Sequence, residues 1–196
     1  MCGIYGILLN CGTSYNIYSL ILNGLLQLQN RGYDSAGLSV IDKESIEVHK
    51  FASVGSEDAI YKLQQLNLMS DTISVGIGHN RWATHGIKND LNAHPHLSNN
   101  GRLAMLHNGI IENYTQIKTE LLSKGYSFKS DTDTEVLLNF IQDIQENNNS
   151  NLEEALRIAL KRIVGAYCIL LIDQEDPETI IAARKGSPLV IGIGKD

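Results

Sequence analysis

The sequence has no run of lysine and arginine longer than a pair, and its 196 residues carry a formal net charge of −6. A nucleic acid or an anionic membrane surface is therefore not expected as the main partner. No apolar run reaches membrane-spanning length, since the longest, 168–172, has the length of a strand. The N-terminus has no basic region, and Gly3, Gly6 and Asn10 interrupt its apolar run, so no secretory signal is expected.

Cysteine is scarce. The chain contains Cys2, Cys11 and Cys168, and no CxxC pair occurs. An odd, dispersed set forms no disulfide framework and is typical of a reducing compartment, so we expect a cytoplasmic protein. Cys168 in "AYCILLI" is predicted to be a small core side chain, and Cys11 in "NCGTS" a loop thiol.

The hydrophobic fraction of 43% fits a globular core, and the length fits one domain. Strands are predicted at 4–10, 38–42, 46–51, 73–82, 103–107, 166–173, 179–184 and 189–193. Helices are predicted at 15–30, 56–67, 113–124, 136–145 and 152–164, the last two opened by capping boxes at 132–135 and 150–153. Most consecutive strands are joined by short turns, which favours an α+β fold with antiparallel sheets covered by helices.

Two features between these elements stand out. The glycines of "ISVGIGHNRW" predict close packing against the strand at 73–82. Residues 84–100 are predicted to form a long irregular loop, and a loop of that length in a compact domain is usually functional or disordered.

The chain opens with "MCGIYG", in which removal of Met1 would make Cys2 the N-terminal residue. A free α-amine and a thiol on one residue form a nucleophile that has its own base. Because a cysteine at this position can also occur by chance, the interpretation depends on the rest of the chain.

The stretch "HNRWATHG" follows a predicted strand. Arg81 is either an ordinary surface arginine or a guanidinium that binds a carboxylate through two hydrogen bonds. Thr84 and His85 could donate to the same carboxylate. Trp82, the only tryptophan, is either core filler or part of a lid at the start of the long loop.

Two further stretches each allow two interpretations. In "LHNGIIENY", Asn108-Gly109 is either a simple turn or an oxyanion hole built from a side-chain amide and a backbone N–H. In "SDTDTEV", Asp133 is either an acid favoured at a helix N-terminus or a carboxylate that binds a ligand ammonium.

The histidines of "AHPH" together with His85 raise the alternative of a metal site. Their spacing matches no common zinc pattern, and no cysteine pair assists them. A papain-like Cys–His pair would need Cys2, and the residues around Cys2 do not provide the expected context. No metal or organic cofactor is therefore expected.

Six stretches occur in order along the chain: "MCGIYG", "RGYDSAG", "HNRWATHG", "NAHPH", "HNGIIENY" and "SDTDTEV". Together they resemble the glutaminase domain of the glucosamine-6-phosphate synthase (glutamine–fructose-6-phosphate aminotransferase) family, which are class II, N-terminal-nucleophile glutamine amidotransferases. The likeness runs from Cys2 to "AARKGSPLVIGIG", so residues 2–196 are expected to form one such domain. Amidophosphoribosyltransferases share the Cys-Gly start and the HNG stretch but lack the WATHG and NAHPH runs.

The resemblance implies a role for each matching residue near the reacting bond. Cys2 matches the nucleophile, and Asn108 and Gly109 match the oxyanion hole. Arg31 and His94 match residues near the site with supporting roles.

The resemblance also implies how glutamine is held. Arg81, Thr84 and His85 match the residues that bind its α-carboxylate, and Asp133 matches the partner of its α-ammonium. Trp82 lies in the loop that closes over glutamine.

The fold that the resemblance implies is a four-layer αββα sandwich of antiparallel sheets, the N-terminal-nucleophile hydrolase fold. The implied reaction hydrolyses the side-chain amide of L-glutamine to glutamate and ammonia through a Cys2 thioester. The ammonia would serve glucosamine 6-phosphate synthesis from fructose 6-phosphate. The alternatives are the glutaminase domain of another class II amidotransferase, such as amidophosphoribosyltransferase, and a non-catalytic glutamine-binding module.

The family's sugar-phosphate isomerase domain is absent from this sequence. We expect that domain as a partner, either on a longer chain or as a separate subunit, alongside L-glutamine. The family's glutaminase domain also continues beyond the point where this sequence stops, so its last strands are expected to be missing and a sheet edge to be uncovered.

Overall fold

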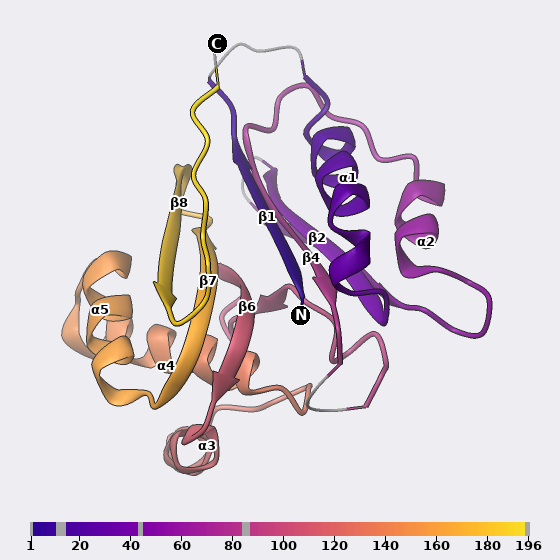
Figure 1. Ribbon diagram of the computed structural model, residues 1–196. Coiled ribbons are helices and arrows are strands. Elements are labelled where there is room, and N and C mark those ends of the chain that lie inside the picture. Colours follow the sequence, from indigo (N-terminus) through magenta and orange to yellow (C-terminus); the bar gives the residue numbers. More distant parts are fainter. Residues whose placement is uncertain (1, 11–14, 43–44, 84–86, 195–196) are drawn as a thin grey trace.

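A computed structural model describes residues 2–10, 15–42, 45–83 and 87–194 (Figure 1). The elements lie in four layers: two helices, a sheet, a second sheet and three helices. Both sheets have four strands, and every strand pair is antiparallel. The predicted α+β, αββα arrangement is therefore confirmed.

The first sheet has the strand order β1-β4-β2-β3. Its strands are β1 (Gly3–Leu8), β4 (Val75–Arg81), β2 (Ser35–Asp42) and β3 (Ser45–Ala52). The helices α1 (Ile17–Gln27) and α2 (Ala59–Gln65) cover its outer face. A short 3₁₀ turn, Gln29–Arg31, leads from α1 to the "RGYDSAG" stretch.

Helix α1 lies close to the backbone of β4 because that strand has no side chains at Gly76 and Gly78. A Cβ atom at Gly76 would lie 2.5 Å from Ile21 Cδ1, and one at Gly78 would lie 2.6 Å from Ile21 Cγ2. The predicted close packing on this strand is confirmed, and it anchors β4 in the middle of the sheet.

The second sheet has the strand order β5-β6-β7-β8. Its strands are β5 (His96–Leu97), β6 (Leu103–Ile111), β7 (Gly165–Asp173) and β8 (Asp176–Lys185). The helices on its outer face are α3 (Tyr114–Ser123), α4 (Asp133–Asn148) and α5 (Leu152–Arg162). Helix α4 packs directly on β5 and β6.

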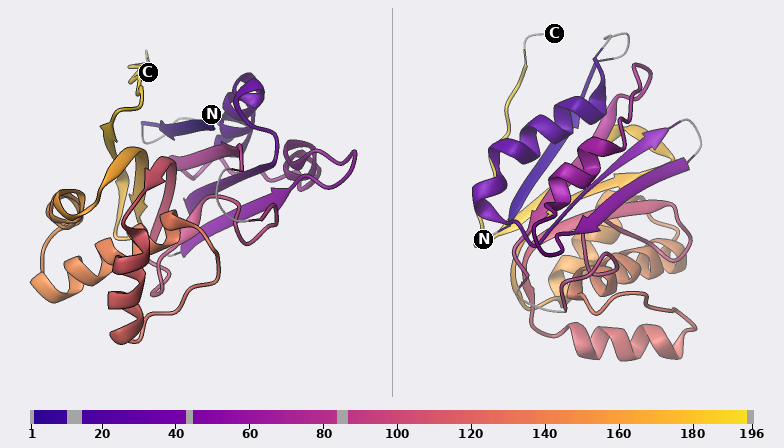
Figure 2. Two further views of the ribbon diagram at one scale, coloured as in Figure 1. Left: turned by 60° about the horizontal axis from the view of Figure 1, so that its bottom comes forward. Right: turned by 90° about the vertical axis from the view of Figure 1, so that its right-hand side faces the viewer.

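The two sheets face each other across a layer of buried aliphatic side chains, and Figure 2 shows the layers from two further directions. These residues are Ile41, Val75, Ile77, Ala104, Leu106, Leu170 and Ile172. Burial of apolar surface is the main force that holds the sheets together. The packing brings β4 against β6 and β7, so their ends lie near each other across the interface.

The predicted strand at 189–193 is wrong. Residues 189–194 form no strand, and they pair with no strand in the described ranges. Val190 is 90% exposed and Ile193 is 96% exposed. An apolar, β-branched run predicts a strand from composition, but a strand also needs a neighbour for its N–H and C=O groups.

The helix starts differ in detail from the two predicted capping boxes. Thr132 caps α4 by accepting a hydrogen bond from the Glu135 N–H, as the first box requires, but the Glu135 carboxylate accepts from the backbone of Lys129 and Ser130 instead. The second box is shifted by one residue, because Asn151 caps α5. Serine and asparagine are about equally good caps, so the sequence did not decide between them.

No helix within the described ranges is long and apolar enough to cross a membrane.

Candidate active site

Cys2 precedes β1 and lies beside the end of β4. The pairing of Gly3 with Asn80 places it next to Trp82, whose N–H lies 3.2 Å from the Cys2 Sγ atom. The thiol in turn lies 3.5 Å from the Trp82 carbonyl oxygen and donates to it. Burial raises the pKa of the Cys2 thiol, although the Trp82 hydrogen bond and the positive charge of Arg81 oppose that rise. The resting sulfur is therefore protonated near neutral pH, and an attack by it needs a base.

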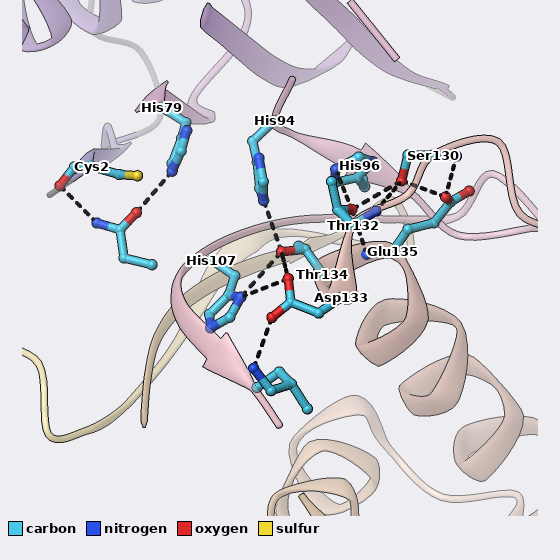
Figure 3. A network of polar contacts seen from close by, with 12 residues as sticks. Cys2, His79, His94, His96, His107, Ser130, Thr132, Asp133, Thr134 and Glu135 are labelled. Atoms are coloured by element: carbon cyan, nitrogen blue, oxygen red, sulfur yellow. Dashed lines mark hydrogen bonds and ion pairs between the residues drawn. The ribbon is translucent and has the colours of Figure 1, made fainter. Parts of the chain in front are cut away.

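The carbonyl oxygen of Cys2 is held by two side chains. Asn108 Nδ2 donates to it at 3.0 Å, and Arg31 Nε donates at 3.3 Å. The other end of the Asn108 amide, Oδ1, lies 2.8 Å from His79 Nε2 (Figure 3). The structure thus brings Cys2, Arg31 and Asn108 together from three separate parts of the chain.

Asn108-Gly109 lies inside β6 and not in a turn. Strand β6 continues to Ile111, so the predicted strand end at 107 and the turn interpretation are both wrong. Gly109 has φ +139°, and a Cβ atom there would collide with the Ala166 carbonyl oxygen on β7. The glycine allows β6 and β7 to approach more closely than a residue with a side chain would.

Arg81 ends β4 and lies deep in the site. The residue is only 5% exposed, so the alternative of a surface arginine is wrong. Burial lowers the pKa of the guanidinium, and the nearby Cys2, Asp34 and Asp133 oppose that effect. Cys2, Arg81, Gly109 and Asp133 all line one narrow cavity. A guanidinium that lines a cavity is chemically suited to bind an anionic group of a ligand.

Asp133 is the first residue of α4, so one of its two sequence interpretations, an acid at a helix N-terminus, is confirmed. Its Oδ2 atom accepts a hydrogen bond from the Ile111 N–H at 2.8 Å, which ties the helix to the end of β6. Its Oδ1 atom lies 4.0 Å from His107 Nδ1. The carboxylate therefore lies at the cavity with one oxygen already engaged by the backbone.

Trp82 lies at the edge of the site. Its side chain is 44% exposed and its ring centroid lies 5.6 Å from that of Tyr33. The interpretation of Trp82 as a buried core side chain is therefore wrong. Thr84 and His85, which were predicted to donate to the same carboxylate as Arg81, lie outside the described residues.

His94 is buried beneath the cavity in a group of histidines. Its ring stacks on His79 with the centroids 4.5 Å apart, and its Nε2 atom lies 2.8 Å from Thr134 Oγ1. The same hydroxyl oxygen lies 3.1 Å from His107 Nδ1. His96 meets the His94 ring edge-on at 4.7 Å and lies 3.0 Å from Thr132 Oγ1 (Figure 3).

Burial keeps these rings neutral. It lowers the pKa of His79 to about 3 and the pKa values of His94 and His96 well below 6.5. Among the described residues, no group of three or more histidine, cysteine, aspartate or glutamate side chains could hold a metal ion. Our sequence analysis missed His79 and Thr134, although both lie within motifs that it singled out.

The sequence profile of the glutamine amidotransferase domain family matches residues 79–194. These residues run from His79 through Asn108 and Asp133. The chain belongs to this family.

Curated relatives of this amidotransferase domain match the whole chain. The glutamine–fructose-6-phosphate aminotransferase (isomerizing) of Bacteroides thetaiotaomicron is 46% identical over 198 residues, covering 100% of this chain and 31% of that protein. The protein of the same name from Chlorobaculum tepidum is 45% identical over 99% of this chain and 31% of its own length. The chain thus spans about a third of the curated relatives that it matches.

Two solved structures have a similar fold. A structure titled glutamine phosphoribosylpyrophosphate amidotransferase from B. subtilis has a TM-score of 0.69 and 29% identity, over 89% of this chain and 35% of that one. A structure titled an allosteric regulatory enzyme of purine biosynthesis has a TM-score of 0.72 and 30% identity, over 94% of this chain and 37% of that one. This amidotransferase domain therefore has the fold of N-terminal-nucleophile amidotransferases.

Proposed function

We propose that this amidotransferase domain hydrolyses the side-chain amide of L-glutamine to glutamate and ammonia, with Cys2 as the nucleophile. One observation carries the proposal: Cys2, the buried Arg81, Gly109 and Asp133 line the same cavity, and Asn108 contacts Cys2 beside it. A glutamine molecule has an amide carbonyl, a carboxylate and an ammonium, and this set offers a group of suitable chemistry for each.

The reaction begins when the Cys2 sulfur attacks the amide carbonyl carbon. Because burial raises the pKa of the thiol, its proton must go to a base, and the α-amine of Cys2 serves once Met1 has been removed. A free α-amine has a reference pKa of about 7.7–8.0, which suits a base near neutral pH. The amine then returns the proton to the leaving nitrogen as ammonia departs, and water hydrolyses the thioester.

Asn108 and Gly109 stabilise the oxyanion in this proposal. The Asn108 Nδ2 atom carries two hydrogens, and the bond to the Cys2 carbonyl uses one of them. The second hydrogen and the Gly109 N–H are then available for the developing negative charge. Loss of one such donor typically costs about 10²–10³ in kcat.

The remaining site residues bind the substrate or support the nucleophile. Arg81 holds the α-carboxylate of glutamine with Thr84 and His85, and Asp133 holds the α-ammonium. Trp82 belongs to the loop that closes over the substrate.

Two residues have supporting roles in this proposal. Arg31 fixes the Cys2 carbonyl, to which it donates at 3.3 Å. His94 supports the floor of the cavity through the Thr134 hydroxyl. No metal or organic cofactor takes part in this chemistry.

We further propose that residues 2–196 act as the ammonia-supplying domain for conversion of fructose 6-phosphate to glucosamine 6-phosphate, with a sugar-phosphate isomerase domain as partner. The relatives named glutamine–fructose-6-phosphate aminotransferase support this acceptor, because their identity of 45–46% exceeds the 29–30% of the two solved structures. A free thiol nucleophile also fits a reducing compartment, which supports a cytoplasmic location.

The direct test is release of glutamate from glutamine by the purified chain. We expect glutamate to form in protein whose intact mass shows that Met1 is absent, and not in protein that carries an N-terminal tag. The tagged chain still has the thiol but lacks the free amine. Full activity of a tagged chain would exclude the α-amine as the base, and absence of glutamate from both proteins would favour a non-catalytic binding module.

Arg81→Lys should raise the apparent KM for glutamine by about tenfold or more, because an ammonium cannot form the two parallel hydrogen bonds of a guanidinium. Steady-state kinetics measure the effect, and kcat should change less than KM. Arg102→Lys is a matched control, since Arg102 pairs with Asp173 and Glu175 away from the cavity. Unchanged kinetics in Arg81→Lys would show that Arg81 has only a structural role.

A further inference from the structure

The orientation of the Asn108 amide follows from its two neighbours. Its Nδ2 atom lies 3.0 Å from the carbonyl oxygen of Cys2, and its Oδ1 atom lies 2.8 Å from His79 Nε2. A carbonyl oxygen can only accept a hydrogen bond, so the NH₂ end of the amide must face Cys2. The oxygen end then faces His79 and needs a donor there.

His79 can supply that donor in only one tautomer. Burial lowers the pKa of His79 to about 3, against the opposing effect of the Asn108 hydrogen bond, so the ring is neutral near neutral pH. A neutral imidazole carries one N–H, which must be at Nε2 to face the Asn108 oxygen. Among the described residues, His79 Nδ1 has no hydrogen-bond partner, although the backbone of His107, like Asn108, opposes the fall in the pKa of the ring.

The His79 ring is itself held firmly. Strand β4 pairs with β1 on one side and β2 on the other, where His79 lies opposite Ile4 and Gly37. The ring is 1% exposed and stacks on His94 at an interplanar angle of 27°. His94 is fixed in turn by Thr134 at the start of α4 (Figure 3). A donor that cannot move gives the Asn108 amide one favoured orientation.

We propose that His79 is a positioning residue that holds Asn108 with its NH₂ group toward Cys2 and toward the oxyanion formed there. The inference rests on the proposed role of Asn108 in amide hydrolysis. Without the His79 donor, only the Cys2 carbonyl orients the amide, and the oxygen end is presented to the negative charge more often, which changes an attraction into a repulsion. Substrate binding by Arg81 and Asp133 does not depend on this contact.

A double-mutant cycle with Asn108 tests the inference. His79→Leu should lower kcat about 10–100-fold, up to the effect of losing one oxyanion donor, and should leave KM within about threefold. Asn108→Ala should lower kcat about 10²–10³-fold. The double variant should be no slower than Asn108→Ala alone, because His79 acts through Asn108. A loss in the double variant equal to the product of the two single losses would overturn the proposal.

A more conservative variant guards against a loss of activity that is caused by misfolding. An NMR measurement tests the contact without relying on turnover. His79→Gln places an amide N–H at a similar reach and should restore most of kcat, whereas His49→Gln on β3 is a control that should change neither constant. In ¹⁵N NMR spectra at pH 7, His79 should be neutral with its proton on Nε2. A proton on Nδ1 would overturn the proposal whatever the kinetics. A wild-type chain that releases no glutamate would refute the proposed function, while the tautomer would still report on the contact.

Discussion

Replacement of Cys2 by alanine will abolish glutamate release and leave glutamine binding largely intact. The sulfur is the atom of the site that bonds covalently to the substrate carbon in the proposed reaction, and no described side chain beside it offers a second thiol. The substrate contacts come instead from Arg81 at the end of β4 and Asp133 at the start of α4. Loss of a catalytic nucleophile can cost about 10⁶ in kcat.

Two measurements separate the chemical role of Cys2 from binding. Calorimetry on Cys2→Ala should give a dissociation constant for glutamine close to that of the wild-type chain, while a glutamate assay should show no turnover. Cys11→Ala is the matched control, since it also removes one thiol and should keep full activity. Turnover by Cys2→Ala would refute Cys2 as the nucleophile, and a large loss of binding would show that the sulfur also holds the substrate.

Mild acid should unfold the protein, because three buried histidines stay neutral in the folded state. Burial lowers the pKa of His79 to about 3, and it lowers those of His94 and His96 well below 6.5. Below about pH 6.5 the unfolded chain binds protons at these rings while the folded chain does not. The free energy of unfolding therefore decreases as the pH is lowered. Each ring contributes about 1.4 kcal/mol per pH unit, and the three together contribute about 4 kcal/mol per pH unit. A domain has about 5–15 kcal/mol in all, so we expect unfolding near pH 5.

Denaturant titrations at pH 7, 6 and 5, followed by circular dichroism, measure this loss. His96→Gln is an informative variant, because an amide can still bond the Thr132 hydroxyl but takes up no proton. The variant should reduce the dependence of stability on pH by about 1.4 kcal/mol per pH unit. Equal stability of the wild-type protein at pH 7 and pH 5 would contradict the prediction.

Much of the fold could be predicted from local pattern. Helix α3, the neighbouring strands β2 and β3 and the close packing at the glycines of β4 were predicted because each depends on residues that are neighbours in sequence. The same holds for the motifs, whose order along the chain was enough to indicate the amidotransferase family.

The errors share one physical cause. Asn108-Gly109 is typical of a turn, yet the packing of β6 against β7 keeps it in a strand. The run at 189–193 has the composition of a strand but no partner among the described residues. In both places a long-range contact, or the lack of one, decides the structure, and local propensity is too weak to resist it.

By itself the sequence determined the amidotransferase family, the α+β class and several of the polar residues that line the cavity, because short motifs and periodicity encode these locally. Only the tertiary structure decided how those residues meet. Cys2 and Asn108 are 106 positions apart and join at 3.0 Å because β1, which directly follows Cys2, and β6 lie in sheets that pack face to face. The contact between His79 and Asn108, which sets the direction of an amide, arises from that same packing. No local pattern encodes it, since it depends on the buried side chains of both sheets at once.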